Sequence, residues 1–340
     1  MFIPARIIFE KGSREYPVGQ RIYEKFKDKK EIALIDCSSN KTKSILRKDT
    51  VAETYQNGKR TLVVSLKKAG AFQTCKPSAD YMLPLVSGCM GQCEYCYLHK
   101  QLGDKPFVRV FVNIEDIYKK ALSYMEMSDK DITVFEGSAT SDPLCIEPYT
   151  EILKETILFF AKEPRGRFRF VTKYNDVDGL LAIPHNGKTE IRFSINTEYI
   201  RSSYEHGTAS IEARISAASK VMGAGYPIGF LIAPVFLYTN WKEEYREVIW
   251  DLKKALPKDY PYPLFFEVIT HRFTPKAKEL IQDIFPNSTL PMNEEERIYK
   301  YGQFGYGKYT YKKEDMQDVK AFFQKELKEA FPQCEIKYII

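Results

Sequence analysis

The chain has 340 residues, of which 44% are hydrophobic and 28% charged, and its formal net charge is +6. This hydrophobic content supports a large buried core and excludes a disordered chain. The charge is mild and no tail is rich in arginine, so an acidic partner would be met by a local patch. No apolar run of about 18 residues is present, and residues 1–10 lack a signal-peptide cleavage site, so we expect a cytoplasmic protein without a membrane span.

Residues 1–78 mix short apolar strands, such as the one that begins at Thr61, with charged helices, and we interpret them as an α/β extension. From Asp80 onward, β-branched apolar runs alternate with amphipathic helical patterns, which is typical of βα units around a parallel sheet. The predicted strands are 81–88, 131–138, 167–174, 190–197, 227–236 and 264–273. The predicted helices between them include 114–125, 149–162, 211–222 and 242–256.

Six βα units are fewer than the eight of a closed barrel. The sequence therefore predicts an α/β fold with a partial (β/α)6 TIM-like barrel at 79–275, whose chemistry lies at the C-terminal ends of the strands. A third region, 276–340, is predicted to contain a helix at 276–284, an aromatic β-hairpin at 297–313 and an amphipathic helix at 314–331.

Three of the seven cysteines, Cys89, Cys93 and Cys96, lie within eight residues with the spacing C-x3-C-x2-C. An odd, clustered set of thiols does not suit a disulfide framework and indicates metal or redox ligands in a reducing compartment. Three thiolates on a short loop that contains Gly91 can bind three irons of a cubane cluster. The fourth iron is then open to substrate or cofactor.

Two other interpretations of these cysteines stay open on the residues alone. A structural zinc ion needs a fourth ligand, and His99 lies three residues beyond Cys96. The three cysteines could also be unconnected buried thiols, although a loop flanked by Gly88 and Gly91 favours exposure.

The cysteine motif after the first barrel strand resembles that of radical S-adenosylmethionine (SAM) enzymes. More of the chain resembles one family of them, the spore photoproduct lyases. The similar segments lie between about residues 76 and 311, and they are KPSADY, GCMGQCEYCYL, KPFVRVFVN, FVTKY, HNGKTEIRFSIN, GAGYPIGFLIAP, HRFTPKAK and YGQFGYGKY.

The resemblance implies a [4Fe-4S] cluster on Cys89, Cys93 and Cys96 that reduces and cleaves SAM. The resulting 5′-deoxyadenosyl radical would abstract hydrogen from spore photoproduct, 5-thyminyl-5,6-dihydrothymine, in UV-damaged DNA. The lesion would revert to two thymines and SAM would be regenerated. It further implies an electron donor of the flavodoxin or ferredoxin type and a place in the spore core or germinating cell. We expect a monomer, because no strongly apolar exposed helix stands out.

Several site residues follow from local similarity to the family. The predicted SAM contacts lie at or near strand C-termini: Ser141, Lys173, Ser194 and Ala233. Tyr97 is implied as a hydrogen-atom relay and Tyr95 as its supporting partner. Without the family, Ser194 and Ala233 could be ordinary strand packing, and the tyrosines could simply pack beneath the cysteine loop.

One position departs from the family, whose members usually carry the hydrogen-donating cysteine in the loop after the second strand. This chain has Ala139 there, and alanine has no labile hydrogen. Either the chain is an engineered variant that stalls, or another thiol donates. We predict Cys75, which precedes the first barrel strand, as the donor, with Cys145 as the second candidate and as a buried structural thiol otherwise.

The hairpin interleaves tyrosines with lysines, so its lysines can meet phosphates while an aromatic tip with Gln303 and Phe304 wedges between bases. His271 and Arg272 are further candidates for the lesion backbone. A solvated hairpin and a core histidine are the alternatives. At the level of function, the alternatives are another radical SAM enzyme on nucleic acid, such as a tRNA-modifying one, and a zinc-stabilised nucleic-acid-binding protein.

Overall fold

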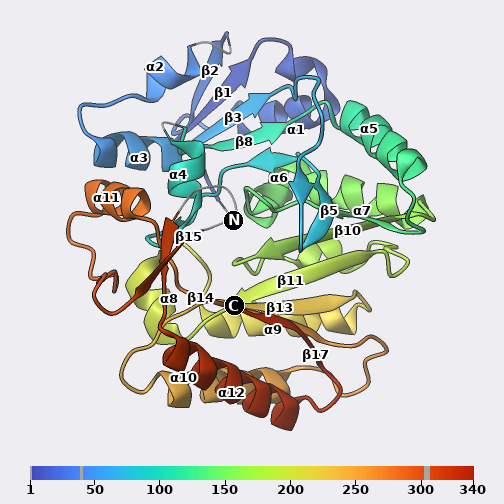
Figure 1. Cartoon of the computed structure of the whole chain (residues 1–340). Coiled ribbons are helices and arrows are strands. Elements are labelled where there is room, and N and C mark those ends of the chain that lie inside the picture. The colour runs from blue at the N-terminus through green and yellow to red at the C-terminus, as the bar shows by residue number, and fades with distance from the viewer. Residues whose placement is uncertain (1, 39–40, 104, 302–306) are drawn as a thin grey trace. The chain divides into compact units, whose positions relative to one another are not determined.

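The computed structural model describes residues 2–38, 41–103, 105–301 and 307–340 (Figure 1). The chain forms two compact units. Unit 1 comprises residues 1–90 and 102–191, and unit 2 comprises residues 91–101 and 192–340. The sequence predicts three functional regions with boundaries at 78/79 and 275/276. These boundaries differ from those of the two compact units, and the functional regions stay a prediction. In the described ranges, no helix has the length and apolar character needed to cross a membrane.

A five-stranded sheet in unit 1 contains three of the four strands of the predicted N-terminal extension. Its order is β2 (Ala33–Cys37), β1 (Arg6–Glu10), β3 (Thr61–Ser65), β8 (Val108–Phe111) and β6 (Val86–Ser87). β1 runs parallel to β2 and β3, and every residue of β3 is buried, as expected for a parallel strand covered on both faces. The helical elements of this region are η1 (Ser13–Glu15), α1 (Pro17–Phe26), α2 (Thr42–Leu46) and α3 (Val51–Lys59).

The predicted strand at 81–88 is wrong in its extent. The structure has two short strands there, β5 (Ala79–Met82) and β6, and they belong to different sheets. Pro84 lies between them and has no backbone N–H to continue a ladder, so the strand ends and the chain changes sheet. β5 also pairs antiparallel with β4 (Thr74–Cys75).

The barrel strands of unit 1 are parallel, as predicted: β9 (Thr133–Glu136) pairs with both β5 and β10 (Gly166–Thr172). The connecting helical elements are α5 (Ile114–Met127), η2 (Pro143–Ile146), α6 (Glu147–Thr150) and α7 (Ile152–Lys162), and η3 (Asp178–Leu180) follows β10. The helix predicted at 149–162 is divided because Glu151 has a left-handed backbone, with φ at 50°. Alternate residues of β10 are buried.

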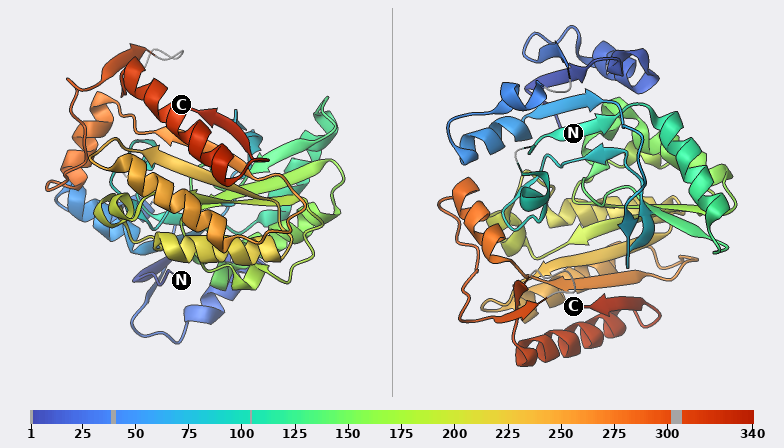
Figure 2. Two further views of the ribbon diagram at one scale, coloured as in Figure 1. Left: turned by 90° about the horizontal axis from the view of Figure 1, so that it is seen from below. Right: turned by 45° about the horizontal axis from the view of Figure 1, so that its top comes forward.

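Unit 2 continues the alternation of strands and helices. Its neighbouring strands are β11 (Thr189–Ile195), in which the boundary between the units falls, β13 (Ile228–Val235), β14 (Phe265–Thr270) and β17 (Glu335–Ile339). β14 runs parallel to both β13 and β17. The helices α9 (Ile211–Gly223), α10 (Trp241–Ala255) and α12 (Lys313–Ala330) lie side by side (Figure 2).

The remaining elements of unit 2 are short. The two-residue strands β7 (Gln92–Cys93) and β12 (Glu205–His206) pair antiparallel. The helices are α4 (Leu98–Leu102), α8 (Glu198–Tyr204) and α11 (Pro275–Ile284). β15 (Ile298–Tyr301) and β16 (Gly307–Thr310) are the two strands of the predicted hairpin, and they pair antiparallel.

Candidate active site

Cys89 follows β6 in unit 1, and the residue before it has to be glycine. Gly88 has φ of 80°, and a Cβ there would lie 2.1 Å from the Phe107 carbonyl oxygen. The Gly88 amide donates to the Thr140 carbonyl over 2.8 Å, and Gly88 forms an isolated parallel bridge with Ser141. The backbone therefore places the first cysteine of the motif beside the loop after β9.

The loop after β9 is held by its own polar side chains. Ser141 is buried, and its hydroxyl donates to the Gly137 carbonyl over 3.3 Å. The next residue, Asp142, accepts the Lys173 amide at 2.7 Å through Oδ2. The predicted SAM contacts Ser141 and Lys173 thus lie on adjacent strand ends of unit 1, which are joined through Asp142.

The two candidate hydrogen donors differ in access. Cys145 is only 2% exposed, and its thiol donates to the Asp142 carbonyl over 3.0 Å. Burial raises the pKa of Cys145 well above its usual value, and the nearby Cys89 and Asp142 raise it further. Cys75 is half-buried on the short strand β4.

Cys75 lies beside a turn that reaches the end of β9. Ser78 in that turn makes two contacts: its hydroxyl is 3.4 Å from Glu136, the last residue of β9, and its carbonyl accepts from Arg169 on β10 at 2.6 Å. Ala139 follows Glu136 by three residues. The turn beside Cys75 therefore contacts the C-terminal end of β9, and the loop that carries Ala139 begins at that same end.

The other two cysteines of the motif lie on a tight turn in unit 2. Cys93 is buried, Cys96 is half-buried, and the Cys96 amide donates to the Cys93 carbonyl over 3.1 Å. The Nε2 atom of His99 is 2.9 Å from the same carbonyl. That nitrogen must carry a proton to donate to a carbonyl, so a zinc ion at this side chain would be bound by Nδ1.

Both residues between Cys93 and Cys96 are anchored by side chains. Glu94 is buried, pairs with His206 at 2.7 Å and accepts from the Ser288 hydroxyl. Tyr95 donates its phenol to the Glu205 carboxylate. Burial, followed by the charge on Glu205, raises the pKa of Tyr95 well above its usual value, so the phenol keeps its proton.

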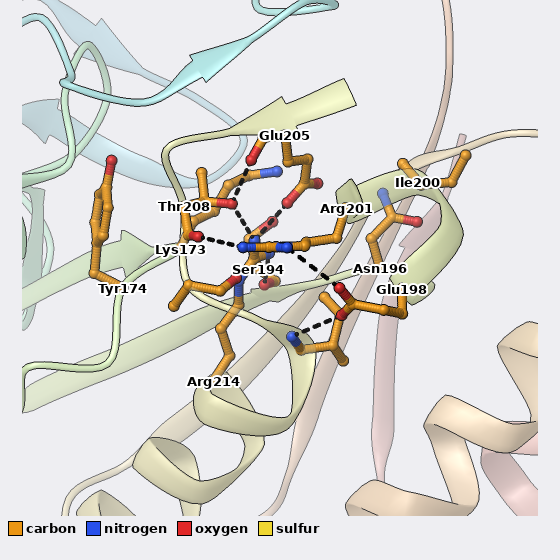
Figure 3. A network of polar contacts seen from close by, with 12 residues as sticks. Lys173, Tyr174, Ser194, Asn196, Glu198, Ile200, Arg201, Glu205, Thr208 and Arg214 are labelled. Atoms are coloured by element: carbon orange, nitrogen blue, oxygen red, sulfur yellow. Dashed lines mark hydrogen bonds and ion pairs between the residues drawn. The ribbon is translucent and has the colours of Figure 1, made fainter. Parts of the chain in front are cut away.

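Glu205 belongs to a fully buried ion pair with Arg214 (Figure 3). The Arg214 guanidinium lies 2.6 Å from Glu205, 2.8 Å from the Thr208 hydroxyl and 3.0 Å from the Ser194 carbonyl. Ser194 is itself 2% exposed and lies near the end of β11. Arg214 therefore holds both Ser194, a predicted SAM contact, and Glu205, the residue that accepts the Tyr95 phenol.

Ala233 and Pro234 lie near the C-terminal end of β13, where Ala233 is half-buried. Asn196 donates to the Pro234 carbonyl over 3.0 Å and accepts from the Tyr245 hydroxyl at 2.7 Å. These bonds join the ends of β11 and β13. The predicted SAM contacts Ser194 and Ala233 therefore lie near the ends of these two neighbouring strands.

Tyr97 is not packed beneath the cysteine loop, because its side chain is 63% exposed. It lines an open cavity of about 730 Å3 in unit 2. The other lining residues come from α4, the start of α11 and the hairpin: Lys100, Gln101, Thr274, Pro275, Lys276, Tyr299 and Gly307. A relay residue at such a position can meet a ligand from solvent.

His271 has the surroundings of a core residue. It is 2% exposed, and its ring centroid lies 4.5 Å from that of Phe236. Burial, with a smaller contribution from the charge on Arg297, lowers the pKa of His271 to about 3, so the ring is neutral. Arg272 is exposed. Gln303 and Phe304 lie outside the described residues.

The cysteine motif is divided between the units, with Cys89 in unit 1 and Cys93 and Cys96 in unit 2. Over the described ranges, no group of three His, Cys, Asp or Glu side chains is gathered as for a metal ion. The donor chemistry nevertheless fits an iron–sulfur cluster. All three thiols are free of disulfides, and Cys89 and Cys96 are partly exposed.

Parallel strands alternate with helices, and polar side chains collect at the strand C-termini, which is the arrangement of an α/β-barrel enzyme. The family model for spore photoproduct lyase matches residues 2–340. The chain is 49% identical to the spore photoproduct lyase of Clostridium acetobutylicum, over 98% of both chains. It is 40% identical to that of Bacillus subtilis, over 99% of this chain and 98% of the other. The chain belongs to the spore photoproduct lyase family, and it is an enzyme.

Solved structures of spore photoproduct lyase resemble the whole fold. One holds AdoMet (that is, SAM) and dinucleoside spore photoproduct, and it carries one cysteine-to-alanine and one serine-to-cysteine substitution. It matches this chain with a TM-score of 0.95 at 40% identity, over 100% of this chain and 99% of the other. A second, complexed with dinucleoside spore photoproduct, matches equally well. The match confirms the predicted α/β partial barrel.

Sequence reasoning missed the buried residues that support the site. Arg214 lies on the apolar face of α9, three residues after Ile211 and three and four residues before Ala217 and Ala218. A cation at such a position signals a buried partner, because a lone charge there is too costly. The same signal could not identify Glu205 as that partner, since the pairing depends on the tertiary fold.

Proposed function

We propose that this protein repairs spore photoproduct in UV-damaged DNA, as a radical SAM carbon–carbon lyase with an iron–sulfur cluster. The observation that carries the proposal is the full-length similarity to spore photoproduct lyases, combined with three cysteines that form no disulfide and have the radical SAM spacing. Relatives with 40% identity bind AdoMet and dinucleoside spore photoproduct.

In this proposal Cys89, Cys93 and Cys96 hold the cluster, and the AdoMet contacts are Ser141, Lys173, Ser194 and Ala233. When bound, the cluster and AdoMet supply a 5′-deoxyadenosyl radical that removes a hydrogen atom from the lesion. The protein contributes orientation. The Lys173 ammonium suits the AdoMet carboxylate, and Arg214 fixes the strand that carries Ser194.

Cys75 completes the repair in the proposed mechanism. After the bridge between the thymines breaks, the remaining thymine radical takes a hydrogen atom from Cys75. The S–H bond breaks, a C–H bond forms and a sulfur radical remains. The Tyr97 phenol would give its hydrogen atom to that sulfur radical, so that the S–H bond forms again, and would regain one from 5′-deoxyadenosine, with Tyr95 in support. The exposure of Tyr97 and the anchored phenol of Tyr95 suit these roles.

Access favours Cys75 over Cys145, whose thiol is buried and already donates to a carbonyl. The relative solved with both AdoMet and lesion offers a parallel. There a cysteine is replaced by alanine and a serine by cysteine, which is the combination this chain has if Ala139 and Cys75 are the corresponding positions. Ala139 would then be part of a working enzyme in which the thiol has changed place.

The test of the proposed function is an anaerobic assay of dinucleoside spore photoproduct with AdoMet and dithionite. We expect free thymidine, no net loss of AdoMet, and a brown protein with iron and sulfide. The variant Cys96→Ala should lose the cluster and the activity together. A colourless protein with one zinc ion would support the nucleic-acid-binding alternative instead. A cluster-containing protein without thymidine release would point to another radical SAM reaction.

The described part of the hairpin supports DNA as the natural substrate. Lys300 and Lys308 lie directly opposite each other on β15 and β16, a pairing of like charges that destabilises a hairpin. Burial, followed by the charges of Arg272 and Lys300, lowers the pKa of Lys308. Three cations held this close are favourable when phosphates neutralise them.

Replacing both opposed lysines should weaken DNA binding without affecting the dinucleoside reaction. For Lys300→Ala/Lys308→Ala we expect the slope of log affinity against log salt to fall by about 1 for each lysine. Lys254→Ala, an exposed lysine on α10, is the control and should leave the slope unchanged. Binding to lesion-containing DNA at several salt concentrations measures both. An unchanged slope in the double variant would contradict a phosphate role for the hairpin.

The proposal also includes a monomeric protein in a reducing interior, the spore core or germinating cell, that receives electrons from a flavodoxin or ferredoxin. The thiols support the reducing compartment, because none of the seven cysteines forms a disulfide, including the buried Cys145 and Cys334.

A further inference from the structure

We infer that Lys59 and Tyr174 set the reduction potential of the cluster by acting on Cys89, one at its carbonyl group and the other at its sulfur. The inference rests on the proposed function only in taking Cys89 as a cluster ligand. It assigns a redox role to Lys59, which lies in the N-terminal extension and outside the cysteine motif.

Lys59 is the last residue of α3, and its side chain points into unit 1. The residue is only 5% exposed. Its Nζ donates to the Cys89 carbonyl over 2.6 Å and lies 5.1 Å from the centre of the Tyr55 ring. Removing an ammonium group from water is costly unless its partners repay the cost. A buried positive charge is therefore held at the backbone carbonyl of the first ligand.

Tyr174 approaches the sulfur of the same cysteine. It follows β10, directly after Lys173 (Figure 3), and is 9% exposed. Its hydroxyl oxygen lies 3.8 Å from Cys89 Sγ, within the range of a hydrogen bond to sulfur. Its amide donates to the Thr172 hydroxyl over 3.0 Å, which fixes the backbone. A cysteine bound to iron is a thiolate without a proton, so in the loaded protein the phenol is the donor.

Both contacts favour the reduced cluster. Reduction adds one negative charge, and a nearby cation or a hydrogen bond to a ligand sulfur stabilises that charge more than it stabilises the oxidised cluster. Low solvent exposure strengthens both effects, because water screens less. Lys59 and Tyr174 therefore raise the potential and make reduction by a flavodoxin or ferredoxin easier.

The test is a redox titration of the reconstituted cluster, followed by electron paramagnetic resonance, without substrate. We expect Lys59→Met and Tyr174→Phe each to lower the equilibrium constant for reduction about tenfold, which is ~59 mV for a one-electron couple. Lys59→Arg keeps the charge and should stay near the wild type. Lys67→Met is the matched control, because its ammonium also lies over an aromatic ring, 5.5 Å from the centre of Phe111, and should not move the potential.

Unchanged potentials in Lys59→Met and Tyr174→Phe, with full iron and sulfide, overturn the inference. If Lys59→Met does not retain the cluster, Lys59→Gln and Tyr174→Phe decide the matter, since they keep a side chain of similar size. A shift in Lys67→Met as large as that in Lys59→Met also overturns it. Failure of the proposed function is distinguishable, because a wild type without a cluster, or with a cluster but without thymidine release, would reveal it before any variant is compared.

Discussion

Cys75→Ala should divert the repair reaction without stopping its first step. The lesion still loses a hydrogen atom and the bridge still breaks, but the thymine radical has no thiol to quench it. We expect the yield of intact thymidine per turnover to fall by about tenfold or more, a change of ~1.4 kcal/mol in the competing barriers. Product analysis of the dinucleoside reaction, with AdoMet consumption measured in parallel, tests this. Side products and net AdoMet loss should both rise.

Two further variants test which thiol donates the hydrogen atom. Cys145→Ala is the control, because that thiol is buried and bonded to Asp142, and its product should remain thymidine. Cys75→Ala/Ala139→Cys moves a thiol into the loop after β9 and should recover most of the thymidine. Unchanged products in Cys75→Ala, or diversion in Cys145→Ala alone, would show that Cys75 is not the donor.

Much of the fold could be predicted because hydrophobic periodicity is local. Helix α5 and strands β10 and β13 appear within a few residues of their predicted bounds. The errors have identifiable causes. Pro84 divides a run that reads as one apolar strand. β17 was not predicted, because it is a short run of five residues at a sheet edge in which only Ile339 is buried.

The site could be predicted only in part, for a different reason. Its cysteines and strand-end residues are recognisable from short motifs, but their supports come from distant segments. Lys59 reaches Cys89 from 30 positions away, and Glu205 reaches Tyr95 from 110. No local pattern encodes such pairs. His271 shows the reverse case, since a histidine near the end of a barrel strand resembles a ligand contact but packs as a neutral core ring.

The contacts that support the cysteines have one feature in common. Each cysteine-bearing segment is attached to another element through a buried charge: Cys89 through Lys59 in unit 1, and the Cys93–Cys96 turn through Glu94 and Glu205 in unit 2. Apolar packing alone would let a short glycine-containing loop shift. Charged hydrogen bonds are directional and costly to break when buried, so they hold ligand positions more narrowly.

The Arg214–Glu205 pair should therefore be a major contributor to the stability of unit 2. Arg214→Met removes the guanidinium that pairs with Glu205, and both side chains have 0% exposure. Removing one partner of a buried pair costs about 3–5 kcal/mol, because the other charge remains buried. Tyr95 and the Ser194 carbonyl lose their common support at the same time. Urea unfolding of the cluster-free protein, followed by circular dichroism, measures the loss.

Arg201→Met is the matched control, since Arg201 pairs with Glu198 at 3.4 Å on the partly exposed side of the same network (Figure 3). Exposed pairs three residues apart on a helix contribute about 0.3–0.5 kcal/mol, so its midpoint should barely move. Arg214→Met/Glu205→Gln should recover part of the stability that Arg214→Met loses, because the unpaired carboxylate is gone. Equal losses in Arg214→Met and Arg201→Met would mean that water or rearranged neighbours neutralise Glu205, and that the cysteine turn does not depend on this charge.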